Sequence, residues 1–318
     1  MSVAPLTISA IPQPAEVFHH ILMATDFSEA SQRALSGAIA LAAQNHAHLS
    51  VVHVLRTDWR YEILDNPPEL DRERTDAQRR LEAATRDLGF GRALDSIIIR
   101  HGPVAQKVLA LAEEVGADLL VIGTRGRAGL TKLALGSVAE ELLRVAPCPV
   151  ITFGPKANVA PAPQESAFRS ILFATDFGAG SAKARPYVRA LAATPSTRLA
   201  LLHMISPMPA TTNLSAYAPA SAAAEEFQEW QGSSRVRSLA QLKEWWLHDA
   251  RLEREPEYLV GTDFLPEGTL TAAEQRHCDL IVMGANHAAS PRLAAHIPWC
   301  AVHEVIRQAA CPVMTCAG

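Results

Sequence analysis

One segment of the sequence has the composition of an anion-binding loop. Residues 123–137 read GTRGRAGLTKLALGS, in which Gly123, Gly126 and Gly136 are followed by Ser137. Glycine lacks a Cβ and adopts positive φ easily, so phosphate oxygens can come close to backbone N–H groups that point at them. A helix is expected from Ser137 onward, and the N-terminus of a helix favours negative charge. The segment is therefore predicted to bind a phosphate group.

The positive charge inside this loop supports the same interpretation. Arg125, Arg127 and Lys132 would neutralise part of the charge of a phosphate. The loop contains neither the Gly-Lys-Ser or Gly-Lys-Thr ending of a P-loop nor the GxGxxG of a dinucleotide-binding fingerprint. The spacing G-x2-G-x9-G-S thus predicts a phosphate site of another type.

The whole sequence is a tandem repeat. Residues 20–28 (HILMATDFS) align with residues 170–178 (SILFATDFG), and residues 118–123 (DLLVIG) align with residues 279–284 (DLIVMG). The offset between the copies grows along the chain, which predicts an insertion of about a dozen residues in the second copy within 206–252. We expect a first domain over 17–155, a linker over 156–167 and a second domain over 168–318.

The second copy lacks the glycines of the loop. Ile297 and Pro298 stand where Gly136 and Ser137 stand in the first copy, and His287 replaces the middle glycine. Isoleucine does not easily take positive φ, and its side chain would crowd a phosphate. Proline has no N–H to donate, although it suits the first turn of a helix. The second copy is therefore predicted to keep its helix and to lose its phosphate site.

Alternating apolar strands and amphipathic helices must position the loop. In the first copy, apolar runs predict strands over the ranges 20–25, 49–55, 97–99, 119–122 and 149–153. Helical periodicity favours helices around 35–42, 70–88, 104–115 and 138–145. Continuous apolar strands are typical of a parallel sheet covered on both faces. Each copy is therefore predicted to be a Rossmann-like α/β domain with a five-stranded doubly wound sheet, which binds ligands where the strand order reverses.

The composition excludes several classes of protein. The 318 residues carry a net charge of −4 and are 48% apolar, which is ample for two buried cores and argues against disorder. No long basic patch points to nucleic acid or to an anionic membrane. Five cysteines without a CxxC pair favour free thiols in a reducing compartment. Because neither a signal peptide nor a membrane-length apolar run is found, we expect a cytoplasmic protein.

The loop spacing, the TDFS turn after the first strand and the CPV of the last strand together resemble the universal stress protein family. The resemblance is to its tandem form with an ATP-binding first domain, and it covers nearly the whole chain. It implies domains of the adenine nucleotide alpha hydrolase-like type and a site for ATP, with ADP or AMP as alternatives and Mg²⁺ as a companion ion. Ala24 departs from the family, which often has proline there.

The family's site, carried over to this sequence, gives roles to residues at several strand ends. Asp26 would accept hydrogen bonds in the adenine region, and Val54 would pack on adenine. The loop glycines and the serine would line the ribose and the phosphates. The implied site residues are Ala24, Thr25, Asp26, Val54, Gly123, Thr124, Arg125, Gly126, Arg127, Gly136, Ser137 and Val138.

The resemblance implies a stress-response regulatory or sensor protein. Family members pair through their last strands, so the CPVIT and CPVMT strands are expected to bring the two copies together, and whole chains are expected to form a homodimer. Two rivals stay open. The same site could belong to a slow ATPase or autophosphorylating enzyme, although no obvious cluster of Mg²⁺-binding carboxylates lies near the loop. The chain could also be a structural module that binds no nucleotide.

Several residues admit a structural interpretation beside a functional one. Asp26 could simply end a strand and cap a helix. His53 and His203 lie inside apolar strands, where histidines are most often hydrogen-bonded core residues. The tryptophan pair at 245–246 predicts a helix packed on the other copy or a lid over a small-molecule pocket. The stretch 277–303 is rich in His and Cys and could hold zinc, although its spacings fit no standard pattern.

Overall fold

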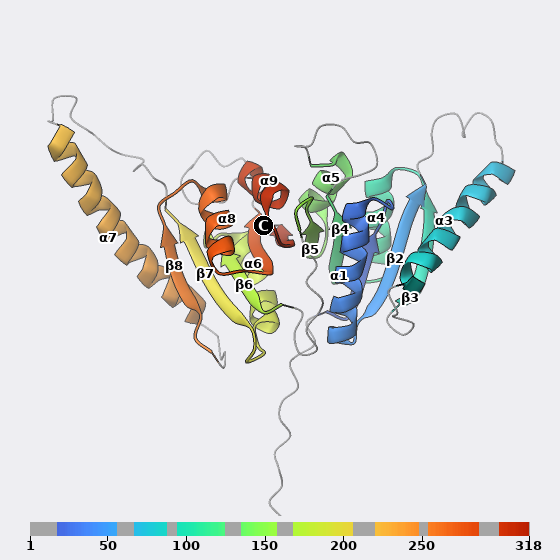
Figure 1. Ribbon diagram of the computed structural model, residues 1–318, viewed down its shortest axis with the longest axis horizontal. Coiled ribbons are helices and arrows are strands. Elements are labelled where there is room, and N and C mark those ends of the chain that lie inside the picture. Colours follow the sequence, from blue (N-terminus) through green and yellow to red (C-terminus); the bar gives the residue numbers. More distant parts are fainter. Residues whose placement is uncertain are drawn as a thin grey trace, which may run out of the picture.

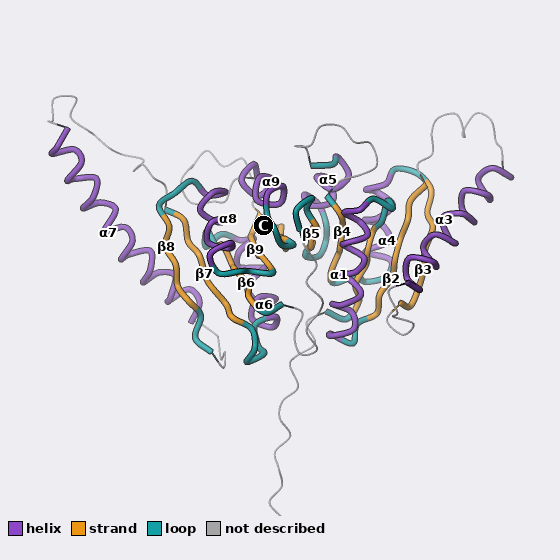
Figure 2. Tube along the Cα trace, in the orientation of Figure 1, coloured by secondary structure: helices purple, strands orange, loops and turns teal. Residues whose placement is uncertain are grey.

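Two α/β units of five strands each lie side by side and share one sheet (Figure 1). The computed structural model describes residues 18–55, 67–87, 94–124, 135–157, 168–205, 220–247, 254–285 and 299–317. Strands form the middle layer, and helices cover both faces (Figure 2). The predicted fold class is confirmed. Among the described helices, none is long and apolar enough to cross a membrane.

The first unit alternates strands and helices in the predicted order. Its elements are β1 (His20–Ala24), α1 (Glu29–Asn45), β2 (His48–Leu55), α3 (Pro67–Asp87), β3 (Leu94–His101), α4 (Val104–Glu114), β4 (Leu119–Gly123), α5 (Ser137–Val145) and β5 (Val150–Phe153). The predicted N-cap of the first helix is confirmed, because the Ser28 side chain accepts a hydrogen bond from Ser31 N at 3.2 Å.

The second unit repeats this order. Its elements are β6 (Ser170–Ala174), α6 (Ala179–Leu191), β7 (Arg198–Met204), α7 (Ala220–Leu247), β8 (Glu257–Gly261), α8 (Leu265–Gln275), β9 (Leu280–Ala285), α9 (Trp299–Gln308) and β10 (Val313–Ala317). Helix α7 has 28 residues where α3 has 21, so part of the predicted insertion lengthens this helix. Residues 206–219, which precede α7, lie outside the described part of the chain.

The sheet runs through both units in the order β3-β2-β1-β4-β5-β10-β9-β6-β7-β8. All neighbouring strands within a unit are parallel, whereas β5 and β10 are antiparallel, with Val313 opposite Thr152 and Thr315 opposite Val150. The expected pairing of the two copies through their last strands is therefore observed within one chain.

Alternate residues of each strand point to opposite faces of the sheet, and each face carries its own buried core. On one face Met23 and Val121 pack with α1, α3, α6 and α7. On the other face Leu22 and Leu120 pack with α4, α5, α8 and α9. Both cores continue across the β5–β10 junction, which makes the junction part of the folded interior.

Helix α7 packs on its own unit. Trp246 is 1% exposed and contacts Phe173 of β6, with ring centroids 6.4 Å apart. Arg185 and Arg189 of α6 donate hydrogen bonds to the carbonyls of Trp245 and Trp246, each at 2.8 Å. The expectation that this helix packs on the other copy is wrong, because the last carbonyls of α7 need donors and α6 of the same unit supplies them.

Two equivalent threonines at the β5–β10 junction differ in their hydrogen bonds. Thr152 Oγ1 donates to Val313 O at 3.0 Å, whereas Thr315 Oγ1 is buried without a partner in the described part of the chain. We expect Thr152→Val to lower the free energy of unfolding by about 1 kcal/mol, because a net hydrogen bond is lost. Thr315→Val is expected to be neutral or stabilising, because it removes an unpaired hydroxyl. Urea unfolding of both variants measures this difference, and equal losses would contradict it.

Candidate nucleotide site

The strand order reverses between β1 and β4. From β1 the chain proceeds outward through β2 to β3, and it then returns to place β4 on the other side of β1. Ala24 lies beside Ile122 in the register of these strands, so Asp26 and Thr124, each two residues further on, leave the sheet at the same level. Doubly wound folds bind ligands at this place, outside the carboxyl ends of the strands.

A tight turn after β1 holds Asp26. Asp26 Oδ1 accepts a hydrogen bond from Ser28 N at 3.0 Å, and Thr25 Oγ1 accepts one from Phe27 N at 3.1 Å. Phe27 has φ 64°, a left-handed conformation that is uncommon for a side chain of this size. Asp26 thus shapes the turn after the strand end, whereas helix α1 is capped by Ser28 and not, as the structural interpretation had it, by Asp26. Its proposed contact with adenine stays a prediction.

His53 and Phe27 hold this turn from one side. His53 Nδ1 lies 2.7 Å from Thr25 O, and because a carbonyl only accepts, the imidazole donates. The Phe27 ring packs on His53 with centroids 4.5 Å apart, and the Arg80 guanidinium of α3 lies 4.0 Å from the Phe27 centroid. The interpretation of His53 as a hydrogen-bonded structural residue is confirmed, although it is only half-buried.

The glycine-rich loop is described at its two ends, which are tied together. Gly136 N donates to Thr124 O at 3.1 Å, and the buried Thr124 hydroxyl donates to Phe153 O at 3.2 Å. Arg125, Gly126, Arg127 and Lys132 lie outside the described residues. The loop therefore leaves β4 and returns to the same point before α5 begins.

The described glycines of the loop are not there for positive φ. Gly136 has φ −66° and ψ 141°, angles that any residue adopts, so the expectation that isoleucine is excluded here by its backbone is wrong. Gly123 lies where β4 passes the start of α1, and a Cβ there would lie 2.6 Å from Ser31 N. Gly123 is therefore required by close packing against α1, whereas the backbone angles of Gly136 require no glycine.

Helix α5 begins at the loop without a capping side chain. Gly136 is its N-cap, and Ser137 and Val138 form its first turn. The first N–H groups of a helix have no partner inside the helix, so they can donate to an anion. Val138 lies in the same apolar cluster as Ala24 and the 6%-exposed Val54. The fold therefore brings the predicted apolar residues and the predicted phosphate end to one edge of the sheet.

The second unit repeats the turn with a different hydrogen bond. Asp176 Oδ1 accepts from Gly178 N at 2.8 Å and also from Ser181 Oγ at 2.7 Å. The equivalent Ser31 Oγ of the first unit donates to Ser28 O at 2.9 Å instead. The sequence motifs did not single out this pair of serines. Burial also lowers the pKa of His203 below its ordinary value, more than the Thr175 carbonyl and the charge of Asp176 raise it.

The second unit carries a larger side chain at the position of Val54. Met204 replaces Val54, and its thioether lies so close to Gly261 and Gly268 that a Cβ at either glycine would overlap it. The first copy has Arg100 and Lys107 at the positions of these glycines. A position-by-position comparison of the two copies would have revealed that a larger residue at 204 goes together with glycines at 261 and 268. The second unit therefore differs from the first at both ends of the candidate site.

The His- and Cys-rich stretch forms no metal site in the described part of the chain. No group of three or more His, Cys, Asp or Glu side chains is arranged there to hold a metal ion, and His287, His296 and Cys300 fall outside the side chains described. Cys148, Cys278, Cys311 and Cys316 are free. Burial raises the pKa of Cys148, Cys311 and Cys316 to about 12, which makes them poor nucleophiles.

Comparison with known proteins gives the family. The model of the universal stress protein family matches residues 18–153 and 167–316. The chain is similar to the universal stress protein YxiE of Bacillus subtilis, with 32% identity over 42% of this chain and 98% of that protein. A universal stress protein from Archaeoglobus fulgidus aligns with 95% of this chain and 96% of its own, at 18% identity and a TM-score of 0.61. A universal stress protein solved in complex with cAMP aligns with 42% of this chain and 95% of its own (23% identity, TM-score 0.33). The two family matches, one for each half, show that this chain belongs to the universal stress protein family in a tandem form.

Proposed function

We propose that the first domain binds an adenine nucleotide, ATP foremost, at the carboxyl edge between β1 and β4. The observation that carries the proposal is the closed loop: Gly136 N returns to Thr124 O, and the chain then enters a helix whose N-terminus has no capping side chain. Free N–H groups at a helix N-terminus favour a phosphate. The resemblance of the loop to the ATP-binding members of the family supports the choice of nucleotide.

Each candidate residue has a role in this proposal. Asp26 Oδ1 is engaged by Ser28 N, so the carboxylate is fixed at the strand end where it can accept hydrogen bonds from adenine. Val54 and Ala24 give the base an apolar wall. The phosphates would meet the N–H groups of Gly126, Ser137 and Val138, with Arg125, Arg127 and Thr124 around them. Gly136, whose N–H is engaged by Thr124 O, would leave room for them by having no side chain.

The second domain is proposed not to bind a nucleotide in this way. Asp176 already accepts a hydrogen bond from Ser181, and Met204 occupies the apolar end. At the phosphate end, Ile297 and Pro298 replace the glycine and the serine. The nucleotide would therefore act as a signal bound on one side of a two-domain protein, with stress-response regulation in the cytoplasm as the outcome.

The proposal is tested by measuring how many nucleotides bind to each chain and whether they are hydrolysed. Native mass spectrometry of the purified full chain with ATP is expected to show one nucleotide per chain, and denaturing release followed by mass spectrometry identifies ATP, ADP, AMP or cAMP. Two per chain would overturn the asymmetric site, and none at millimolar ATP would overturn the nucleotide site. A parallel assay for released phosphate separates a sensor, which shows no turnover, from a slow ATPase.

A homodimer of whole chains remains part of the proposal. The edges of β5 and β10 are already paired within one chain, so a second chain must use another surface. The mass of the assembly in the same native spectra shows whether the protein is a monomer or a homodimer.

A further inference from the structure

The amino-terminal edge of the first domain's sheet carries a pair of histidines. His20 begins β1 and His48 begins β2, and the two are register partners on adjacent parallel strands. Their imidazole centroids are 6.0 Å apart, and the rings are tilted by 59°. This edge lies at the opposite end of the strands from the candidate nucleotide site, so the pair is separate from it.

One nitrogen of each imidazole is held by a neighbouring side chain. His48 Nδ1 lies 3.0 Å from Asp95 Oδ1 of β3, and Asp95 Oδ2 in turn accepts from Leu49 N at 2.7 Å. His20 Nε2 lies 2.9 Å from Ser50 Oγ of β2, which also accepts from Ser96 Oγ at 2.9 Å. With a metal ion on Nδ1, His20 would carry its proton on Nε2 and donate it to Ser50 Oγ. Because a carboxylate only accepts, neutral His48 carries its proton on Nδ1 and presents a lone pair on Nε2.

Histidines that bind metals have this arrangement, in which a carboxylate or another polar group holds the ring nitrogen that faces away from the metal. In the described part of the chain, no hydrogen bond engages His20 Nδ1 or His48 Nε2. The His48 side chain is 72% exposed, so an ion can reach it from solvent. Imidazole nitrogens suit Zn²⁺, Ni²⁺ and Cu²⁺, whereas Ca²⁺ and Mg²⁺ prefer oxygen ligands.

We propose that His20 and His48 bind one divalent ion of the Zn²⁺, Ni²⁺ or Cu²⁺ class, with water completing the coordination. Asp95 and Ser50 are positioning residues that fix the two rings. Each ring contributes one neutral nitrogen, so binding competes with protons and weakens in acid. The site is independent of the proposed nucleotide site.

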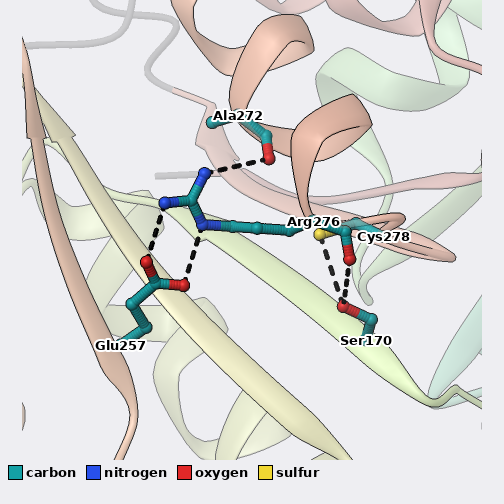
Figure 3. Close-up of polar contacts among 5 residues, drawn as sticks. All are labelled: Ser170, Glu257, Ala272, Arg276 and Cys278. Carbon is teal, nitrogen blue, oxygen red and sulfur yellow. Dashed lines mark hydrogen bonds and ion pairs between the residues drawn. The ribbon is translucent and has the colours of Figure 1, made fainter.

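The same edge of the second domain cannot bind a metal in this way. Ser170 and Arg198 are register partners at the positions of the two histidines. As Figure 3 shows, Ser170 Oγ donates to Arg276 O at 3.1 Å and lies 3.6 Å from Cys278 Sγ. The Arg276 guanidinium bonds both carboxylate oxygens of Glu257, at 2.8 and 2.7 Å. Neither of the two register partners carries an imidazole here, and the neighbouring charged groups form a guanidinium–carboxylate pair, so the proposal predicts one ion per chain.

Calorimetric titration of the EDTA-treated full chain with Ni²⁺ at pH 7.5 tests the proposal. We expect one ion per chain, a loss of at least about 10-fold in affinity for His20→Ala and for His48→Ala, and a loss of about 10- to 100-fold for Asp95→Asn. His46→Asn is the matched control: it changes an exposed histidine next to the site, and asparagine tolerates the left-handed backbone of this position.

Three results would overturn the two-histidine site. One is the absence of saturable Ni²⁺ binding, and another is binding that both alanine variants keep within about twofold, which would place the ion elsewhere. The third is affinity that is unchanged between pH 7.5 and pH 5.5, because neutral imidazoles must be the ligands. Circular dichroism of each variant checks that it is folded, so a loss of affinity is not a loss of structure.

Discussion

A chain that carries Gly136→Ile together with Ser137→Pro is expected to bind ATP about 100-fold more weakly while it stays folded. The exchange gives the first domain the residues of the second. Isoleucine fits the backbone angles of Gly136, φ −66° and ψ 141°, and proline fits the first turn of a helix. The fold is therefore expected to be preserved, whereas a side chain would occupy the proposed place of the phosphate and one N–H donor would be lost.

The magnitude follows from the lost contacts. A hydrogen bond to a charged group contributes about 1.5–3 kcal/mol, and each 1.4 kcal/mol is about tenfold in affinity. Calorimetric titration with ATP measures the loss, and thermal unfolding checks the fold. The control chain carries Ile297→Gly with Pro298→Ser, which should leave affinity and stoichiometry unchanged. If the Gly136 variant bound ATP as the unmodified chain does, the phosphates would not lie at the start of α5.

Gly123→Ala is expected to destabilise the protein by about 3 kcal/mol, as overpacking of an interior does. The added Cβ would lie 2.6 Å from Ser31 N and 2.7 Å from Ala30 C. Both are backbone atoms at the start of α1, so they cannot move aside without moving the helix and the turn that holds Asp26. Chemical denaturation followed by fluorescence measures the loss of stability.

Gly232→Ala is the matched control for this experiment. Gly232 lies inside α7, and apart from its chain neighbours and the backbone of its own helix no described atom lies within 4 Å of the Cβ that alanine would add. Alanine is the better helix former by about 1 kcal/mol, so this variant should gain stability rather than lose it. A loss for Gly232→Ala, or tolerance of Gly123→Ala, would contradict the account of where close packing requires glycine.

The repeat made much of the site predictable. Thr25 and Asp26 recur as Thr175 and Asp176 after a strand in each copy, so their place at a strand end could be read from the sequence alone. The pairing of β5 with β10 followed from the family resemblance. Because these features depend on local patterns or on repetition, the sequence is sufficient for them.

Other features depend on contacts between distant segments. Gly123 was predicted to line the ribose and phosphates, yet its observed neighbour is Ser31, far away in the chain. Likewise, α7 packs on Phe173 of β6 and accepts hydrogen bonds from Arg185 and Arg189 of α6, contacts that no local pattern of the helix reveals. Such contacts can be predicted only when the order of the strands in the sheet is known.

The antiparallel contact of β5 with β10 affects which amino-acid substitutions the two halves can tolerate. Because both strands belong to one polypeptide, their pairing is intramolecular and its occupancy does not fall when the protein is diluted. In an assembly of identical chains, every substitution at such a contact occurs twice, and both copies must tolerate it. Here a substitution changes only one of the two strands, because each strand has its own place in the chain. The two strands already differ, since Thr152 and Thr315 make different hydrogen bonds. Having both copies in one chain thus lets one half specialise while the other keeps the shared sheet intact.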